Sequence, residues 1–304
     1  MSRRVLITGA GGFVGSHLAA GFLAAGDSVI ALDQAFDAPT ALRLTHAQLV
    51  EMAMSRETLA ALPDVDLVIH GAAITTPPEE LGLSDAEHIA ANLELLTMCL
   101  EFAVERRASD FVFISSSGVF SSEDGNGIHL ETTSATASIA YALAKRQGEA
   151  ATDAATSTSL RTLSVRLGPI YGPHEAARDT RRIVSQIRRW LDRAEAGEPI
   201  VVTMPDEHRD WTFAPDLASA MRTLLGLEPK LSGVVHLTSA DIISNLELAQ
   251  TIATIVSTAE VISAPGSATP RLPMASVRID MPSMIGWTSL SAGLRQTHET
   301  EVMA

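Results

Sequence analysis

Short runs of apolar residues alternate along the first half of the chain with longer segments of helical periodicity. The runs are Val5–Ile7, Val29–Leu32, Leu67–Ile69, Phe111–Ile114 and Leu163–Val165. Segments 16–25, 85–106 and 139–155 lie between them and favour helix by their content of alanine, leucine and glutamate. Near-continuous apolar strands that alternate with helices are typical of a parallel sheet covered on both faces. The pattern therefore predicts an α/β fold.

The pattern changes after about residue 170. Residues 178–193 are basic and amphipathic, residues 198–202 resemble a strand, and a helix is expected near 215–226. We therefore expect a large α/β domain over residues 1–170 and a smaller, mixed domain over residues 171–304. Some segments of about 209–240 are expected to return to the large domain, and the strand-like run Val234–Leu237 is the clearest of them.

Composition excludes several classes of function. The formal net charge of −14 argues against a nucleic-acid partner, because binding phosphate backbones requires a concentrated basic surface. A single cysteine, Cys99, rules out an internal disulfide and fits a cytoplasmic location. The uncharged stretch between Arg4 and Asp27 contains six glycines, which is untypical of a signal peptide, so no targeting segment and no membrane span are expected.

A glycine-rich turn follows the first expected strand and begins the first helix, with the sequence Thr8-Gly-Ala-Gly-Gly-Phe-Val-Gly15. Glycines at these positions permit a tight turn and let backbone N–H groups approach a pyrophosphate at the positive end of the helix. Asp33 ends the next strand, where an acid binds the adenosine ribose hydroxyls and repels a 2′-phosphate. The turn therefore predicts dinucleotide binding, with NAD favoured over NADP. Arg43 keeps NADP open as the alternative.

Tyr141 and Lys145 lie four residues apart, on one face of an expected helix. The chain has only two tyrosines and two lysines, so this spacing is informative. A tyrosine has an ordinary pKa of about 10, and a nearby ammonium favours its phenolate as a base for a substrate hydroxyl. The hydroxyls of Ser115-Ser116-Ser117 follow a strand end, where open α/β sheets bind ligands.

These motifs together resemble the extended short-chain dehydrogenase/reductase family, which contains nucleotide-sugar epimerases and dehydratases. The resemblance rests on TGAGGFVG at 8–15, HGAA at 70–73, Asn92, SSSGVF at 115–120, YALAK at 141–145, GPIYGP at 168–173 and RDWTFAPDLA at 209–218. It covers nearly the whole chain. It implies a Rossmann-type, doubly wound NAD(P)-binding domain with a smaller C-terminal substrate-binding domain.

The resemblance also implies a role for each matching residue. Ser116, Tyr141 and Lys145 would be catalytic, with Tyr141 as general base, and Ser117 is the alternative to Ser116. The cofactor would contact Gly9, Gly12, Phe13, Val14, Gly15, Asp33, Ala72, Ala73, Tyr141 and Lys145. Ser117 and Arg209 would contact substrate, and Asn92 would support the active-site region or be an ordinary core polar group.

Some features depart from the family pattern or remain open. Met52 stands where many relatives have an acid that touches adenine. Residues 161–209 hold nine arginines, which form either a patch for an anionic substrate or a set of solvated side chains. No carboxylate–histidine spacing suggests a metal site.

We expect an NAD-dependent enzyme that oxidises a carbohydrate hydroxyl, in the manner of a nucleotide-sugar epimerase. A dehydrogenase of a small sugar or sugar acid is the alternative, and a non-catalytic dinucleotide-binding protein is a third. Relatives commonly pair two long helices across a two-fold axis, so segments 85–106 and 139–155 suggest a homodimer.

Overall fold

A seven-stranded parallel sheet, in the order β11-β6-β5-β4-β1-β2-β3, is the central element of the fold. The structure is a computed structural model and describes residues 2–177, 184–239, 241–257, 259–264, 266 and 270–302. The strands are β1 (Arg4–Thr8), β2 (Ser28–Asp33), β3 (Gln48–Glu51), β4 (Leu67–His70), β5 (Asp110–Ser116), β6 (Arg161–Leu167) and β11 (Gly233–Leu237). β1 pairs with both β2 and β4, so the strand order reverses there. Ligands of doubly wound sheets bind beyond the carboxyl ends of the strands at such a point.

This sheet confirms the expected Rossmann-type α/β fold. The five apolar runs form β1, β2, β4, β5 and β6, and the run Val234–Leu237 joins the sheet beside β6 as expected. Strand β3 was not expected. It lies at the sheet edge and only Val50 among its four residues is even partly buried, so no apolar run marks it.

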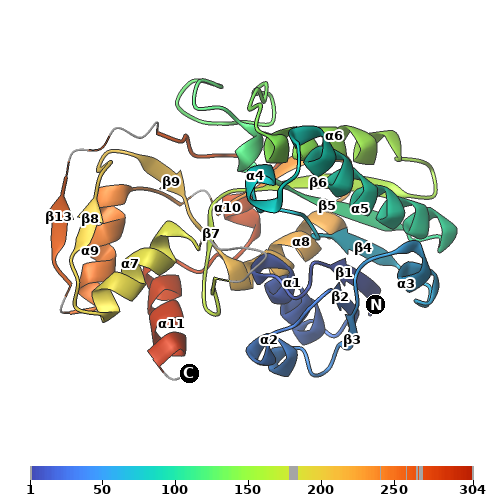
Figure 1. Ribbon diagram of the computed structural model, residues 1–304, viewed down its shortest axis with the longest axis horizontal. Coiled ribbons are helices and arrows are strands. Elements are labelled where there is room, and N and C mark those ends of the chain that lie inside the picture. The colour runs from blue at the N-terminus through green and yellow to red at the C-terminus, as the bar shows by residue number, and fades with distance from the viewer. Residues whose placement is uncertain are drawn as a thin grey trace. The chain divides into compact units, whose positions relative to one another are not determined.

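Helices cover both faces of this sheet (Figure 1). On one face α5 (Asp85–Glu105) packs against α6 (Ala140–Ala154) and the short α3 (Arg56–Ala60). On the other face α1 (Phe13–Ala24) packs against α8 (Leu217–Gly226). The two sets lie on opposite faces because right-handed crossovers lead from β1 to β2 in one direction and from β4 to β5 in the other. Two short helices, α2 (Ala38–Arg43) and α4 (Pro78–Leu81), lie in the connections.

The starts of α1 and α5 differ in a way that matters for ligand binding. Ser84 and Glu87 form a capping box at the start of α5, so side chains satisfy its first backbone N–H groups. The N-cap of α1 is Gly12, and no side chain in the described part of the chain caps this end. The amino end of α1 can therefore offer its N–H groups to an anion.

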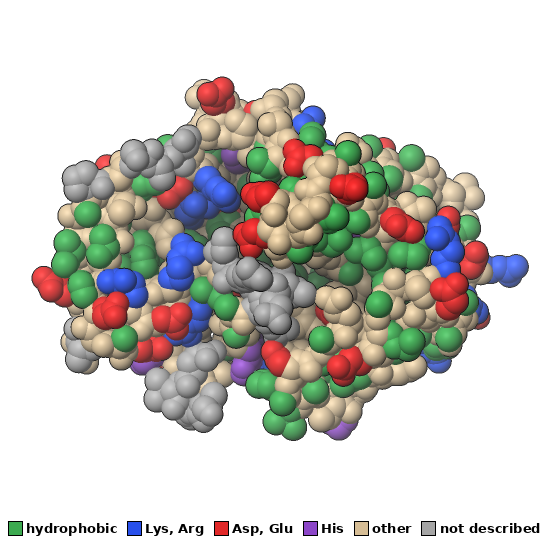
Figure 2. All heavy atoms as spheres, in the orientation of Figure 1, with side chains coloured by type: hydrophobic (Ala, Val, Ile, Leu, Met, Phe, Trp, Pro, Cys, Tyr) green, Lys and Arg blue, Asp and Glu red, His purple; other side chains and the backbone are tan. Residues whose placement is uncertain are grey.

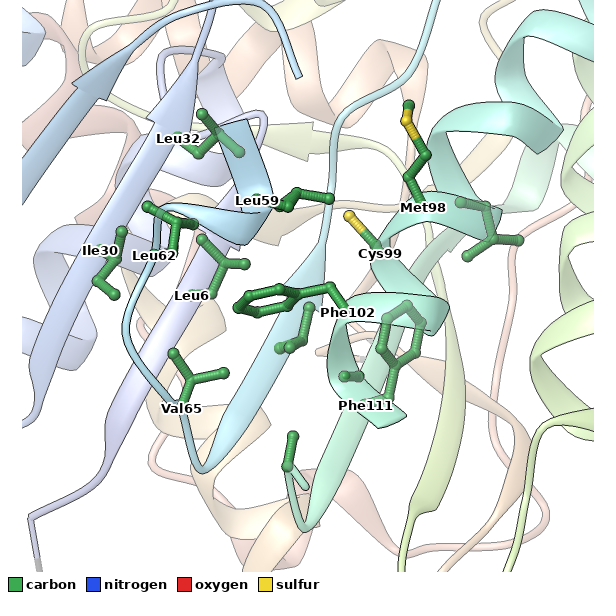
Figure 3. Close-up of a cluster of buried hydrophobic side chains, with 14 of the residues drawn as sticks. Leu6, Ile30, Leu32, Leu59, Leu62, Val65, Met98, Cys99, Phe102 and Phe111 are labelled. Carbon is green, nitrogen blue, oxygen red and sulfur yellow. The ribbon is translucent and has the colours of Figure 1, made fainter. Parts of the chain in front are cut away.

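Apolar side chains fill the space between the sheet and the helices on the α5 face (Figure 3). Leu6 and Phe111 point from the sheet toward Phe102 and Cys99 of α5, and Leu59 of α3 closes the cluster. All five side chains are at most 3% exposed. Burial of this kind contributes roughly 25 cal/mol per Å² of apolar surface, so the cluster holds the strand ends in fixed positions.

The remaining elements form a second compact unit. It contains β7 (Ile170–Tyr171), α7 (Gln186–Glu195), β8 (Ile200–Val202), β9 (His208–Asp210), β10 (Thr212–Phe213), β12 (Ile242–Ser244), α9 (Asn245–Ile255), β13 (Val261–Ser263), α10 (Met281–Met284) and α11 (Leu290–Val302). The strands form three two-stranded sheets, β10-β7, β12-β9 and β13-β8. Trp190 and Leu191 of α7 pack with Leu248 of α9 and Leu294 of α11 in its core.

The chain passes between the two units several times. Unit 1 comprises the chain up to Val119, Ala137–Arg166 and Pro215–Val235; unit 2 comprises Phe120–Thr136, Leu167–Ala214 and the chain from His236 onwards. Unit 2 thus includes a loop between β5 and α6, which sequence periodicity does not mark. The assignment of cofactor to residues 1–170 and of substrate to 171–304 remains a prediction.

Candidate active site

The glycine-rich turn of unit 1 is packed too closely for larger side chains. Gly9 has a φ of +71°, and a Cβ there would lie 2.7 Å from the backbone nitrogen of Ala72. A Cβ on Gly15 would collide with the Gly9 carbonyl. Gly12 and Val14 are half-buried, whereas Phe13 and Gly15 are buried. The turn therefore exposes backbone at the uncapped end of α1, which fits a pyrophosphate.

Asp33 lies against this turn from the end of β2. Its Oδ2 accepts a hydrogen bond of 2.9 Å from the Gly11 backbone N–H, and its Oδ1 accepts one of 2.7 Å from the Gln34 N–H. Arg43 of α2 donates to Ser16 Oγ, in the first turn of α1, at 2.9 Å. The structure thus brings an acid and an arginine to the same turn.

The HGAA motif follows β4, the neighbour of β1. Thr8 Oγ1 lies 2.9 Å from Nδ1 of His70 and accepts a 3.3 Å hydrogen bond from the Ala72 N–H. Burial, with a smaller contribution from the Lys145 charge, lowers the pKa of His70 to about 3. His70 is therefore neutral at pH 7 and ties the two central strand ends together. Ala72 and Ala73 follow it at the strand end and are half-buried.

Asn92 fastens the segment beyond this motif to α5. Its Oδ1 accepts from the Ile74 N–H at 2.9 Å, and its Nδ2 donates to the carbonyls of Ile74 and His88 at 3.3 and 3.0 Å. Both ends of the amide are thus satisfied by backbone. The geometry favours the supporting interpretation of Asn92, because the segment that it holds leaves the end of β4.

Ser116 and Tyr141 lie next to each other at the end of β5. Ser116 Oγ accepts a 3.0 Å hydrogen bond from the Gly118 N–H. A Cβ added to Gly118 would be 3.2 Å from Ser116 Oγ and 3.4 Å from the Tyr141 ring. Gly118 therefore keeps the space beside both side chains open. Ser117 begins a 3-10 turn, Ser117–Val119.

Lys145 lies one helical turn beyond Tyr141, and it is buried. Its Nζ donates to the Ile114 carbonyl at 2.7 Å and lies 4.7 Å from the centre of the Phe113 ring and 5.7 Å from that of the Tyr141 ring. Burial lowers the pKa of Lys145 to about 8, and the Glu149 carboxylate opposes that effect. The ammonium is thus present at neutral pH and can be lost slightly above it.

Glu149, which the sequence interpretation missed, completes this group. It is buried one turn beyond Lys145, and its carboxylate accepts two hydrogen bonds of 2.7 Å from Arg166 of β6. Ser115 Oγ donates to the same carboxylate at 2.6 Å. The signal was available in the chain, because residues 141, 145 and 149 recur every four positions along one helix face.

Arg209 lies in unit 2, on β9, within a second network. Its Nε donates to Glu207 Oε1 at 3.1 Å, and Glu207 also accepts from Asn245 Nδ2 at 2.9 Å. The Arg271 backbone N–H donates to Glu207 Oε1 at 2.7 Å. Burial lowers the pKa of Arg209, Glu207 counters this, and the Arg271 charge lowers it further. Arg271 is thus a second arginine near Arg209, and its distance along the chain hid it from sequence interpretation.

Asp210, the next residue, is buried and only partly satisfied by hydrogen bonds. Thr238 and the Met274 backbone form hydrogen bonds with its carboxyl group, whereas Oδ2 has no hydrogen-bond partner among the described residues and lies against Gly168. Burial raises the pKa of Asp210 to about 7. The side chain joins β9 to the segment that follows Arg271.

The rest of the basic segment consists largely of structural ion pairs. Arg161 pairs with Asp110 at 2.5 Å, Arg188 with Asp192 at 2.7 Å and with Glu195 at 2.9 Å, and Arg193 with Glu198 at 3.4 Å. Residues 178, 181 and 182 lie outside the described residues. Figure 2 shows basic side chains over the elements of unit 2 with acidic side chains between them. Most of the described arginines of this segment therefore form ion pairs within the fold.

The described part of the chain offers neither a metal-binding cluster nor a membrane-spanning helix. Within it, no three histidine, cysteine, aspartate or glutamate side chains gather in a way that could hold a metal ion. None of the described helices is long and apolar enough to cross a membrane.

Known proteins resemble this chain along most of its length. The model of the NAD dependent epimerase/dehydratase family matches residues 5–233. The uncharacterised UDP-glucose epimerase YtcB of Bacillus subtilis is 26% identical over 264 residues, which are 82% of this chain and 81% of that protein. The dTDP-4-dehydro-6-deoxy-D-allose reductase of Streptomyces bikiniensis is 27% identical over 271 residues, 84% of this chain and 81% of that protein.

Among solved structures, the UDP-glucose 4-epimerase of Thermotoga maritima, determined with UDP-glucose, has the same fold. The TM-score is 0.82 at 19% identity, and the match covers 99% of each chain. The family match includes the glycine-rich turn, Asp33, Ser116, Tyr141, Lys145 and Arg209. Both the expected resemblance and the expected NAD cofactor are confirmed at the level of the family. The chain belongs to the NAD-dependent epimerase/dehydratase family, whose members are enzymes of the extended short-chain dehydrogenase/reductase type.

Proposed function

We propose that this protein is a nucleotide-sugar epimerase that oxidises a sugar hydroxyl and returns the carbon to the opposite configuration. The observation that carries the proposal is the grouping of Ser116, Tyr141 and Lys145 at the carboxyl ends of the central strands, on the sheet that presents the glycine-rich turn. The names of the Bacillus and Thermotoga proteins support the substrate class.

The uncapped end of α1 and the space kept open by the glycines fit NAD. Gly9, Gly12, Phe13, Val14 and Gly15 would hold the pyrophosphate, Asp33 the adenosine ribose, and Ala72, Ala73, Tyr141 and Lys145 the nicotinamide end. When bound, NAD supplies a hydride acceptor. Arg43 binds Ser16, so in our proposal it supports the turn and does not select a 2′-phosphate.

The proton chemistry belongs to Tyr141. Its phenolate takes the proton of the sugar hydroxyl while the carbon that bears this hydroxyl gives up a hydride and becomes a ketone. The neighbouring ammonium of Lys145 favours the phenolate. Ser116 holds the reacting oxygen and Ser117 a neighbouring sugar hydroxyl. The ketone then accepts a hydride on its other face, and Tyr141 returns the proton.

Arg209 and Arg271 are proposed to bind the diphosphate of the nucleotide sugar. An arginine held by a carboxylate on one side can still offer N–H groups to a phosphate. The Arg271 charge lowers the pKa of Arg209, which indicates two positive charges that an anion would stabilise together. This is the reason why we prefer a nucleotide sugar to a small neutral sugar.

The test is a panel of UDP- and dTDP-sugars, with NAD, analysed by chromatography and by NADH absorbance. An epimerase gives an isomeric sugar without net NADH. The Streptomyces relative is named a reductase, so the second candidate is a dehydrogenase or reductase, which would instead show net cofactor turnover. If NAD bound and no sugar, including sugar acids, reacted, the enzyme proposal would be wrong and a dinucleotide-binding role would replace it.

We also propose that the protein is a homodimer and that it is located in the cytoplasm. Helices α5 and α6 pack side by side, and Val104 on α5 is 59% exposed, which suits a homodimer through this pair of helices. A monomer in light scattering at micromolar concentration would contradict it. The single, buried Cys99 suits a reducing cytoplasm.

A further inference from the structure

The buried carboxylate of Glu149 lies beside the candidate catalytic group and contacts Ser115 and Arg166. Through the helix it lies one turn from Lys145, on the same face of α6. Glu149 also accepts a hydrogen bond of 2.6 Å from the hydroxyl of Ser115, the residue directly before Ser116. Arg166 of β6 fixes the carboxylate with two hydrogen bonds of 2.7 Å, and both side chains of this ion pair are 8% exposed.

We propose that Glu149 is a positioning residue that keeps the buried Lys145 ammonium charged and fixes the strand end that carries Ser116. The proposal rests on the function proposed above. It goes beyond that function because the Tyr141–Lys145 pair becomes dependent on a third side chain, which contacts neither substrate nor cofactor.

The surroundings of Lys145 explain why an additional charge is needed. The ammonium lies against the Phe113 ring and donates to the Ile114 carbonyl, but neither group carries a negative charge. His70 faces it from β4 and is neutral, because its pKa is about 3. Tyr141 lies one turn away on the helix, and Arg166 faces the group from β6. Among the described residues, Glu149 is therefore the carboxylate that raises the pKa of Lys145 against its burial.

Arg166 has a separate task. A carboxylate buried without a partner would itself take up a proton, since burial disfavours its charge. The bidentate guanidinium of Arg166 gives Glu149 this partner and holds its carboxylate in one orientation. Arg166 thus fixes Glu149, and Glu149 stabilises the ammonium of Lys145. That ammonium in turn favours the phenolate of Tyr141.

The chain contains a matched control. Asp110 and Arg161 form another buried ion pair, with an N–O distance of 2.5 Å. They lie at the starts of β5 and β6, whereas Ser115 and Arg166 lie near the ends of these strands. Both pairs join the region around β5 to β6, and removal of one partner from either leaves a buried charge. Only the Glu149 pair adjoins the candidate catalytic group.

The experiment uses the fact that the chain has two lysines, Lys145 and the exposed Lys230. Protein labelled with ¹³C at lysine Cε gives two NMR signals, which are titrated with pH without substrate or NAD. In the wild type, Lys145 should titrate near pH 8. In Glu149→Gln the Lys145 midpoint should fall by about one pH unit. In Asp110→Asn and Ser115→Ala it should remain at the wild-type value.

Unchanged titration of Lys145 in folded Glu149→Gln would overturn the proposal. If this variant does not fold, Glu149→Gln combined with Arg166→Met removes both charges of the pair, which proteins often tolerate. A smaller fall of the Lys145 midpoint, in the same direction, is then expected, because a nearby positive charge is lost as well. The readout needs no enzymatic activity, so an error in the proposed function would not be mistaken for an error in the role of Glu149. With a substrate in hand, Glu149→Asp should restore most of the kcat lost in Glu149→Gln, whereas KM should change little in both.

Discussion

Two cations, the buried Lys145 in one compact unit and the half-buried Arg209 in the other, are held in different ways. Lys145 has an acid, Glu149, one helical turn away on α6, and burial lowers the pKa of Lys145 to about 8. Arg209 is paired directly with Glu207 at 3.1 Å, and a guanidinium keeps its proton in proteins even where burial lowers its pKa. The first group can therefore change its charge near neutral pH, which suits proton chemistry. The second is a permanent charge, which suits the binding of an anion.

The largest expected effect concerns the catalytic pair Tyr141 and Lys145, in which Lys145 can change its charge near neutral pH. Tyr141→Phe keeps the ring but removes the group that takes the substrate proton, so kcat should fall by about 10³-fold, within the range of general base catalysis. NAD affinity should change little. Lys145→Met should lower both kcat and NAD affinity, because the ammonium also contacts the ribose in our proposal. Steady-state kinetics and cofactor titration separate the two results, and wild-type turnover in Tyr141→Phe would contradict the assignment.

Substitution of the permanently charged Arg209 should change mainly the KM for the nucleotide sugar. Arg209→Ala removes a charged hydrogen-bond donor to the diphosphate, worth about 2 kcal/mol, so the KM for the nucleotide sugar should rise by roughly 30-fold. The kcat should stay within a factor of about three. Arg189→Ala is the control, since Arg189 is exposed on α7 and donates to the Val184 carbonyl. Equal effects of the two substitutions would remove the special role of Arg209.

A smaller effect is expected where the cofactor is selected. Asp33→Ala should weaken NAD binding by about tenfold, because the ribose loses a charged acceptor, and NADP should bind relatively better. Glu51→Ala is the matched control, since Glu51 pairs with Asp33 across β2 and β3 at the sheet edge. Titrations with both cofactors measure the effect. Unchanged selectivity in Asp33→Ala would contradict the proposed contact.

The smallest effect is one of stability in unit 2. The folded pKa of Asp210 is raised from 3.8 to about 7, so the folded chain binds a proton more tightly than the unfolded chain. Stability is therefore lost as pH rises between these values, and the full cost is present above pH 7. Asp210→Asn should be more stable than wild type by about 1 kcal/mol at pH 8, and the gain should vanish near pH 4. Urea unfolding at both pH values tests this, with exposed Asp241→Asn as the control; a gain that did not depend on pH would contradict it.

The sequence predicted the elements with strong periodicity and the residues inside contiguous motifs. Five strands, the return of β11 and the ends of α5 and α6 to within one residue followed from apolar runs and helical spacing. Strand β3 was not predicted, because it lacks an apolar run. Glu149, Arg271 and Asp210 were not predicted either, because their roles depend on partners far along the chain. Arg166 is 17 residues from Glu149, and Arg271 is 64 from Glu207. Such pairs arise from tertiary packing, which periodicity does not encode.

The pH dependence of the wild type should distinguish the role of Tyr141 and Lys145 from that of Arg209. Activity should rise with pH as Tyr141 ionises and decline above about pH 8 as Lys145 loses its proton. Binding through Arg209 should not change over this range, because the guanidinium keeps its charge. The decline should therefore appear in kcat at saturating substrate.

The most direct test of the account is rapid mixing of the NAD-bound enzyme with a nucleotide sugar deuterated at the carbon to be inverted. The account predicts a transient NADH absorbance that forms more slowly with deuterium, and an isomeric product that retains the deuterium at that carbon. Tyr141→Phe should give no transient. Isomerisation with loss of deuterium to solvent and no NADH signal would contradict hydride transfer and, with it, the proposed role of the Tyr141–Lys145 pair.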